Sequence, residues 1–306
     1  MASIDVPIHS SVPPRLLNRN GIRVREDVLY ADAKGRDKNK LHKRAAKALD
    51  DLGDILRRVL EPNETIFYIA ETQMMPGALT QFFGGGWHTY SIPRTLLFLT
   101  ERRIIAFRLR KRMRRWVWNR GLRTLRWGDL LEAAPGGFLS RYLTLKFRDG
   151  QKQAYWRFPL GDFKKIKLLI QILKANGAGE SSAAGGMVSL CPNCLATLAP
   201  GNYHCPSCGA RFKDEKTLVW RGIVIPGGAS LYVGANGVGV LRAAFEAIIL
   251  LLIFWSIFSA IREPKASKAA ADLLASIALE CTVLALDKLM AIALSLPQVR
   301  DFIPIE

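Results

Sequence analysis

Residues 94–107 read RTLLFLTERRIIAF, two apolar runs separated by four polar residues. Residues of this kind, aromatic or branched near the backbone, favour β-strands, and the polar break favours a reversal of the chain. Other β-rich runs cover 65–70, 116–118 and 142–147. The last run alternates, turns at Asp149–Gly150 and returns through 154–158, which predicts a hairpin.

Helical periodicity flanks these strands on both sides. Residues 162–174 repeat apolar positions at the spacing of an amphipathic helix, and so do residues 40–60, where Pro62 follows. Residues 1–35 contain scattered Pro and Arg and predict an extended arm, so we assign 1–60 to an arm plus a helix. The predicted fold class is α+β and multidomain, with an antiparallel β-barrel or sandwich closed by a C-terminal helix.

Three motifs in this region resemble those of bacterial pleckstrin-homology-like (PH-like) domains. The stretch from Thr95 to Phe107 is similar to their central strand signature, and Leu60–Glu64 is similar to their usual entry into the first strand. Residues 127–131 (WGDLL) stand where the family begins a later strand. The resemblance covers 61–174, and it implies a domain that binds a partner or a lipid surface.

Two Cys-x-x-Cys motifs follow, CPNC at 191–194 and CPSCG at 205–209, with ten residues between them. This spacing predicts a closed zinc ribbon over 190–212, in which Cys191, Cys194, Cys205 and Cys208 bind one structural Zn²⁺. Four thiolates leave no open coordination position, so the metal stabilises the fold and does not activate water. His204 is expected to be an exposed loop residue. Residues 175–189, rich in Ala, Gly and Ser, predict a flexible linker.

The C-terminal region, 217–306, is strongly apolar and is predicted to associate with a membrane. Residues 243–261 carry one charge, Glu246, and are long enough to form a transmembrane helix. Residues 272–296 predict a second apolar helix with one polar stripe, which either packs inward in the bilayer or lies along its surface. Glu246 and Glu280 suggest an ion or proton path, although neither has an obvious partner in the sequence.

Residues 226–234 (PGGASLYVG) resemble a fingerprint of short bacterial membrane-hairpin modules, which often follow zinc ribbons. The resemblance implies a break between two helical pieces and no chemistry of its own. Such a break is tolerated at membrane depth only where protein covers the freed backbone groups.

The net charge of +18 is unevenly distributed. Residues 1–190 contain 34 Lys and Arg against 17 Asp and Glu, whereas 191–306 contain 10 against 9. Eleven basic residues lie within 101–126, interleaved with tryptophan. The residues predicted to bind an anionic lipid surface are Arg108, Arg110, Lys111, Arg112, Arg114, Arg115, Trp116 and Trp118. Phosphate contacts and stacking suit nucleic acid as well, and a merely solvated basic hairpin is the third interpretation.

The predicted layout is a cytoplasmic (inner) membrane protein whose N-terminal domains and zinc ribbon lie in the cytoplasm. The positive-inside rule and the need to keep the thiols reduced give the same orientation. No nucleotide-binding, hydrolase or metalloprotease motif occurs, so we predict a binding or scaffold protein and no enzyme. Its expected partners are the membrane, an anionic lipid or a protein, with a homo-oligomer also open. The alternative is a nucleic-acid-binding regulator.

Overall fold

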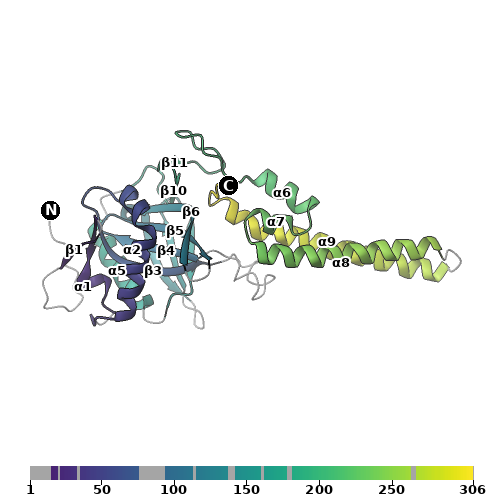
Figure 1. The fold of residues 1–306 in the computed structure, drawn as a ribbon, viewed down its shortest axis with the longest axis horizontal. Coiled ribbons are helices and arrows are strands. Elements are labelled where there is room, and N and C mark those ends of the chain that lie inside the picture. Colours follow the sequence, from purple (N-terminus) through teal and green to yellow (C-terminus); the bar gives the residue numbers. More distant parts are fainter. Residues whose placement is uncertain are drawn as a thin grey trace. The chain divides into compact units, whose positions relative to one another are not determined.

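The computed structural model describes residues 15–19, 21–32, 35–75, 94–112, 115–136, 142–159, 162–177, 181–262 and 267–305. The chain divides into two compact units. The sheet unit contains Met1–Gly77, Ile92–Ala199 and Cys205–Gly209. The helical unit contains Ala78–Ser91, Pro200–His204 and Ala210–Glu306. Figure 1 labels the elements of both units.

The sheet unit is built on one continuous sheet, which is antiparallel except where β2 pairs with β3. Its strands are β1 (Leu16–Arg19), β2 (Ile22–Arg25), β3 (Thr65–Met74), β4 (Arg94–Thr100), β5 (Arg103–Arg112), β6 (Arg115–Arg126), β7 (Leu130–Gly136), β8 (Tyr142–Phe147), β9 (Lys152–Trp156), β10 (Val188–Leu190) and β11 (Thr197–Leu198). Its helices are α1 (Glu26–Leu29), α2 (Asn39–Val59), the 3-10 turn η1 (Trp127–Asp129) and α5 (Asp162–Gly177).

The strand order is β11-β10-β6-β5-β4-β3-β9-β8-β7, with β1 and β2 attached beside β3. Two antiparallel meanders, β3 to β6 and β7 to β9, therefore meet where the end of β3 pairs with β9. The path ends at β11 and at β7, so in the described part of the chain the sheet is open. The α+β prediction is confirmed at this level, and closure into a barrel is not seen.

The stretch 94–107 forms the centre of this sheet. Leu99 pairs with Ile104, and the polar residues between the two runs form the turn. The Thr100 hydroxyl donates to Glu64 over 2.6 Å and accepts from the Arg103 amide over 3.0 Å. The Arg103 guanidinium in turn donates to both carboxylate oxygens of Glu64 at 3.1 and 2.8 Å. This buried network fixes the reversal. The Asp149–Gly150 turn between β8 and β9 is also confirmed, with Gly150 at φ 83°.

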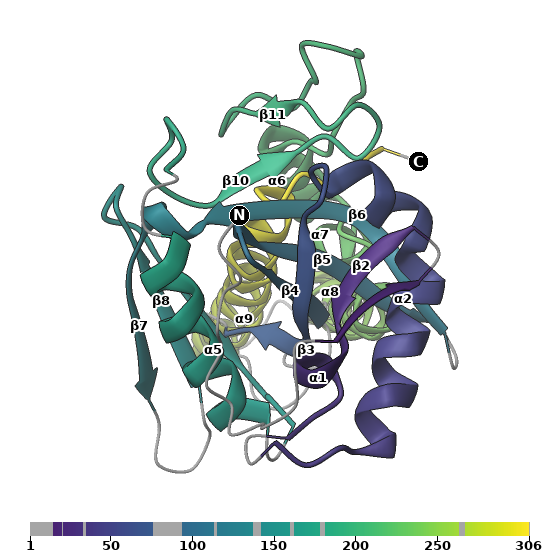
Figure 2. The ribbon, with the colours of Figure 1, turned by 90° about the vertical axis from the view of Figure 1, so that its left-hand side faces the viewer.

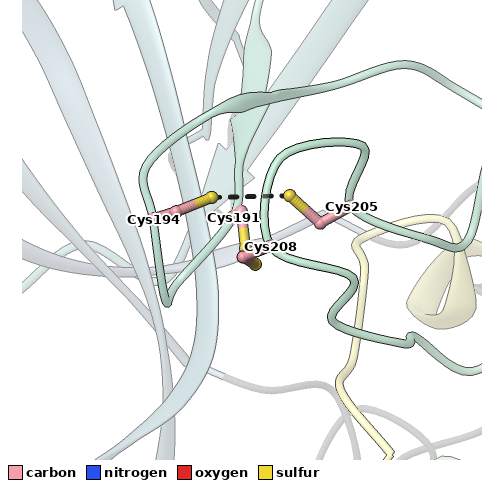
Figure 3. A group of neighbouring side chains, drawn as sticks. All are labelled: Cys191, Cys194, Cys205 and Cys208. Carbon is pink, nitrogen blue, oxygen red and sulfur yellow. Dashed lines mark hydrogen bonds between the residues drawn. The ribbon is translucent and has the colours of Figure 1, made fainter.

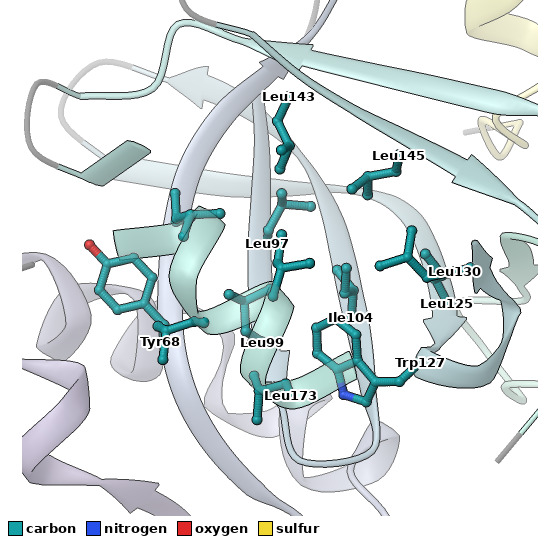
Figure 4. Packing of buried hydrophobic residues seen from close by; sticks show 14 of the residues in the cluster. Tyr68, Leu97, Leu99, Ile104, Leu125, Trp127, Leu130, Leu143, Leu145 and Leu173 are labelled. Atoms are coloured by element: carbon teal, nitrogen blue, oxygen red, sulfur yellow. The ribbon is translucent and has the colours of Figure 1, made fainter. Parts of the chain in front are cut away.

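Both faces of β4 are buried because a helix covers each of them. Leu97 and Leu99 pack with α5 through Leu169 and Leu173. Leu96 and Phe98 on the opposite face pack with α2 and with β2. Figure 4 shows the first cluster around Tyr68, Leu97, Leu99 and Trp127, and Figure 2 shows where α2 and α5 lie. The double burial explains why this strand is almost continuously apolar.

The predicted extended arm is wrong for residues 15–31. β1 and β2 form a hairpin, and β2 runs parallel to β3, with Arg23 beside Thr65. Ile22 and Val24 are buried in the cluster that contains α2. The segment folds because its few apolar residues gain a partner strand some forty residues away, which a local pattern does not reveal.

The predicted flexible linker 175–189 is also ordered where the structure describes it. α5 extends to Gly177, and the buried Asp129 carboxylate accepts the amide and hydroxyl of Ser182 at 2.9 and 2.6 Å. The Asp149 amide donates to the Gly185 carbonyl at 2.9 Å. β10 then pairs with β6, so residues 181–190 lie on the sheet unit.

The helical unit contains α6 (Glu215–Val224), α7 (Gly228–Tyr232), α8 (Asn236–Arg262) and α9 (Ser267–Val299). α8 and α9 run antiparallel beside each other, as Figure 1 shows, and the ion pairs Arg242–Asp287 (3.5 Å) and Glu246–Lys288 (2.7 Å) join them. One helix in the described residues is long and apolar enough to cross a membrane, over Asn236–Ser259. The second predicted helix exists as α9, but its crossing of a membrane is not shown.

The glycine-rich break predicted at 226–234 is confirmed between α6 and α7. Gly227 adopts φ 65°, and a Cβ there would lie 2.1 Å from the carbonyl oxygen of Gly239. Only glycine permits both this conformation and this approach to α8. The Gly227 amide donates to the Glu246 carboxylate at 3.1 Å, so the freed backbone group is satisfied.

Glu246 therefore has partners that were not obvious from the sequence. Its buried carboxylate accepts from the Lys288 ammonium and from the Gly227 amide, and Lys288 also donates to the Gly222 carbonyl at 3.3 Å. Glu280 accepts from the Ser276 hydroxyl at 3.3 Å, and its other carboxylate oxygen is buried with no hydrogen bond among the described residues. The two carboxylates thus occupy different environments.

Candidate metal centre

The two Cys-x-x-Cys motifs form turns of the same shape. In the first, the Leu195 amide donates to the Cys191 carbonyl at 2.9 Å, and in the second the Gly209 amide donates to the Cys205 carbonyl at 2.9 Å. Leu195 and Gly209 both adopt a left-handed conformation, with φ 63° and 71°. Glycine takes this conformation without strain, whereas leucine requires support from its surroundings.

The first turn is supported by the sheet unit. β10 leads into Cys191 after pairing with β6, and β11 returns beside β10. Leu190 and Leu195 pack against the cluster that contains α2, and Arg58 of α2 donates to the Asn193 carbonyl. These contacts hold Leu195 in its left-handed conformation and fix the positions of Cys191 and Cys194.

Backbone pairing holds the chain on both sides of the second turn. His204 before the turn and Arg211 after it pair in an antiparallel β-bridge. Phe212 pairs in the same way with Pro304 near the end of the chain. The Lys213 amide donates to the Ile303 carbonyl at 2.7 Å. These contacts hold the backbone before Cys205 and after Cys208.

The four sulfur atoms converge on one point, as Figure 3 shows. They all lie within 4.8 Å of one another, with Cys191–Cys208 at 3.6 Å and Cys194–Cys205 at 3.4 Å. A tetrahedral metal with metal–sulfur bonds of about 2.3 Å separates its sulfur ligands by about 3.8 Å. All four thiols are free, and a disulfide would need sulfur atoms about 2.05 Å apart. The residues therefore fit a tetrahedral metal ion.

The local environment differs between the two buried thiols. Burial raises the pKa of the Cys191 thiol to about 12. Burial acts in the same direction on Cys205, but hydrogen bonds from the amides of Cys208 and Ser207 outweigh it and lower its pKa to about 7. A thiol with a lowered pKa supplies the first thiolate, and a bound cation then favours ionisation of the others.

The predicted ligand set is thus brought together, and His204 is exposed and outside it, as expected. The supporting residues Arg58 and Leu195 were not predicted. The sequence gives one signal for this support. Leu195 stands where the second motif has Gly209, and a glycine at that place indicates a left-handed backbone.

The basic cluster predicted to bind anions lies on the β5–β6 hairpin, which we call the basic hairpin over residues 108–118. The pairing of β4 with β5 ends at Arg94 and Leu109, whereas β5 and β6 remain paired as far as Arg112 and Arg115. The hairpin backbone therefore extends past the described part of β4. Arg114 lies outside the described residues, as do the side chains of Arg110, Lys111, Arg112, Arg115 and Trp116.

The two predicted anion-binding residues whose side chains are described pack within the sheet unit. Arg108 is 7% exposed and lies against Gly121, where a Cβ would come within 2.9 Å of it. Trp118 is half-buried, donates from Nε1 to the Gly121 carbonyl at 3.1 Å and stacks edge-on with Phe107. Both anchor the base of the hairpin, so a contact with anions would have to come from the residues nearer its tip.

No protein-family model and no curated protein sequence matches the chain. Solved structures that are similar to it include the crystal structure of the C-terminal domain of an unknown protein from Leishmania infantum. That structure is 10% identical, with a TM-score of 0.26, and the match covers 42% of this chain and 98% of the other. A likeness at this level carries no conclusion about fold or function.

Proposed function

We propose that this chain is a membrane-anchored binding or scaffold protein. Its sheet unit acts as a cytosolic PH-like domain that recognises an anionic lipid surface or a protein partner. The cysteine cluster binds a structural Zn²⁺, and α8 with α9 forms a hairpin in the cytoplasmic membrane. No catalytic step is assigned to it.

The observation that carries this proposal is the exposed surface of α8. Only 22% of its most apolar window is buried, whereas the core helix of a soluble domain is mostly buried. Its exposed large apolar side chains include Val240, Leu241, Phe245, Ile248, Leu251, Phe254, Trp255, Phe258 and Ile261. A contiguous apolar surface of this size requires a nonpolar environment, and the length of the helix suits a bilayer.

The sheet topology supports the PH-like part of the proposal. Two antiparallel meanders meet where β3 pairs with β9, and helix α5 packs its apolar side into the cluster between them. The four thiols need a reducing compartment, which favours the cytoplasmic side. In a chain held at a membrane, anionic lipid is the nearest polyanion for the basic hairpin.

Replacement of Arg110, Arg112, Arg114 and Arg115 by glutamate should remove lipid recognition by the full-length chain. In nanodiscs, we expect amide hydrogen exchange across the basic hairpin to slow several-fold when anionic lipid is added to phosphatidylcholine. This slowing should be lost in the variant because each basic group near an anionic surface contributes about 1 kcal/mol to the binding free energy. Hydrogen exchange followed by mass spectrometry measures it.

The matched control replaces Lys40, Lys43, Lys152 and Lys164, four exposed basic residues elsewhere in the sheet unit, by glutamate and changes the net charge equally. Equal exchange in neutral and anionic nanodiscs would remove the lipid interpretation and leave a protein partner. RNA or DNA affinity with a steep salt dependence, lost in the same variant, would instead favour the nucleic-acid-binding alternative.

A further inference from the structure

One face of α6 is apolar and, within the described residues, uncovered by protein. The helix buries only Leu218 and Gly222. On the outer side, Val219 is 38% exposed, Trp220 62%, Ile223 56% and Val224 50%. At about 100° per residue these four side chains fall within an arc of about 140°, which is one continuous face of the helix. A soluble surface rarely presents a tryptophan and three β-branched residues together in this way.

Contacts at both ends hold α6 firmly within the helical unit. At the start, the Asp214 carboxylate caps the helix by accepting the Thr217 amide at 2.8 Å, and Glu215 accepts from Arg300 at 2.9 Å. Toward the end, a Cβ on Gly222 would lie 2.6 Å from Ile292 of α9, so the two helices are in close contact. The apolar face of α6 is therefore a preformed surface and not a frayed segment.

The hydrogen bonds of Lys288 fix the position of α6 along the length of the α8–α9 hairpin. Lys288 joins the Gly222 carbonyl to Glu246, which places the second half of α6 beside that residue. Glu246 lies four residues after Arg242, the charged residue that precedes the apolar stretch 243–261. Four residues of helix correspond to about 6 Å. Apolar side chains of amphipathic helices at a membrane surface are buried about 5–10 Å into the boundary between headgroups and acyl chains, which is a similar depth.

We infer that α6, packed along α9, reaches the membrane boundary and that Val219, Trp220, Ile223 and Val224 contact phospholipid there. This inference rests on the membrane anchoring proposed above. α6 packs against α9, which is the partner of α8 in the hairpin, so a bilayer around the hairpin would also reach the uncovered face of α6. Trp220 is the residue type that anchors at such an interface, and the exposed Lys216 can extend its ammonium toward the headgroups.

Depth-dependent quenching of tryptophan fluorescence tests the inference. The full-length chain is reconstituted into phosphatidylcholine vesicles with lipids brominated either near the headgroup or near the middle of the acyl chain. Comparison with Trp220→Phe isolates the emission of Trp220, and comparison with Trp255→Phe isolates that of Trp255 on α8. We expect the headgroup-proximal bromines to quench Trp220 at least twofold more than the deeper ones. Trp255, thirteen residues beyond Arg242, should show the reverse order.

The two tryptophans test the placement of α6 and the membrane anchoring of the chain separately. Quenching of Trp255 without quenching of Trp220 would overturn the placement of α6 and leave the anchoring intact, and it would indicate water or a second copy of the chain at that face. Absence of quenching at both residues would overturn the anchoring together with the inference. Deep quenching of Trp220 would also contradict it, because α6 would then be immersed in the acyl chains.

Discussion

The substitution Cys191→Ser is expected to abolish tight metal binding by the full-length protein and to unfold the region around residues 190–212. This short region buries few apolar side chains, Leu198 and Phe212 among them, so packing alone supplies little of its stability. A structural zinc site contributes an apparent binding free energy of about 10–16 kcal/mol near neutral pH, and that energy is folding energy. Loss of one of four thiolates should therefore remove most of the local stability.

Metal analysis after dialysis and limited proteolysis measure both effects. The wild-type chain should retain one zinc ion and resist cleavage between the two Cys-x-x-Cys turns, whereas Cys191→Ser and Cys205→Ser should lose both properties. Cys281→Ser is the matched control, because this exposed thiol of α9 is outside the cluster. Full metal retention in the two ligand variants would contradict the proposed centre, as would equal loss in the control.

Lys288→Met is expected to destabilise the helical unit by about 3–5 kcal/mol, the usual cost of breaking a buried ion pair from one side. In the described part of the chain, the variant leaves the Glu246 carboxylate, 1% exposed, with the Gly227 amide as its one remaining donor. It also removes the donor to the Gly222 carbonyl. Unfolding of the full-length chain in mild detergent, followed by helical circular dichroism, measures the change.

The double variant Glu246→Leu/Lys288→Met should recover most of the loss, because neither charge then remains buried without its partner. Glu280→Gln removes another carboxylate from this pair of helices as a comparison. Among the described residues Glu280 accepts a hydrogen bond from the Ser276 hydroxyl alone, so we expect a smaller effect. A Lys288→Met variant as stable as the wild type would show that the pair does not hold the helices together. It would also return Glu246 to consideration as part of an ion path.

Local patterns predicted the elements that depend on local chemistry. The strands on both sides of Thr100, the Asp149–Gly150 hairpin and helix α5 were all predicted, because alternation, turn residues and helical periodicity act over a few neighbours. The four cysteines were predicted for the same reason. Each Cys-x-x-Cys turn is a local structure, and its spacing determines how the thiols are presented.

Long-range contacts account for what was missed. β2 is a strand because of its pairing with β3, and residues 181–185 are held by Asp129 and Asp149, which lie far away in the sequence. The partner of Glu246 is Lys288, 42 residues further along the chain. A charge in an apolar segment indicates that some partner exists, but only the packing of α8 against α9 identifies it.

Extraction of native membranes with alkaline carbonate tests the central claim, that the C-terminal helices reside in a bilayer, most directly. The account predicts that the full-length chain stays in the membrane pellet after carbonate treatment and enters solution only with detergent. Release of the chain into the carbonate supernatant, followed by monodisperse behaviour without detergent, would contradict it.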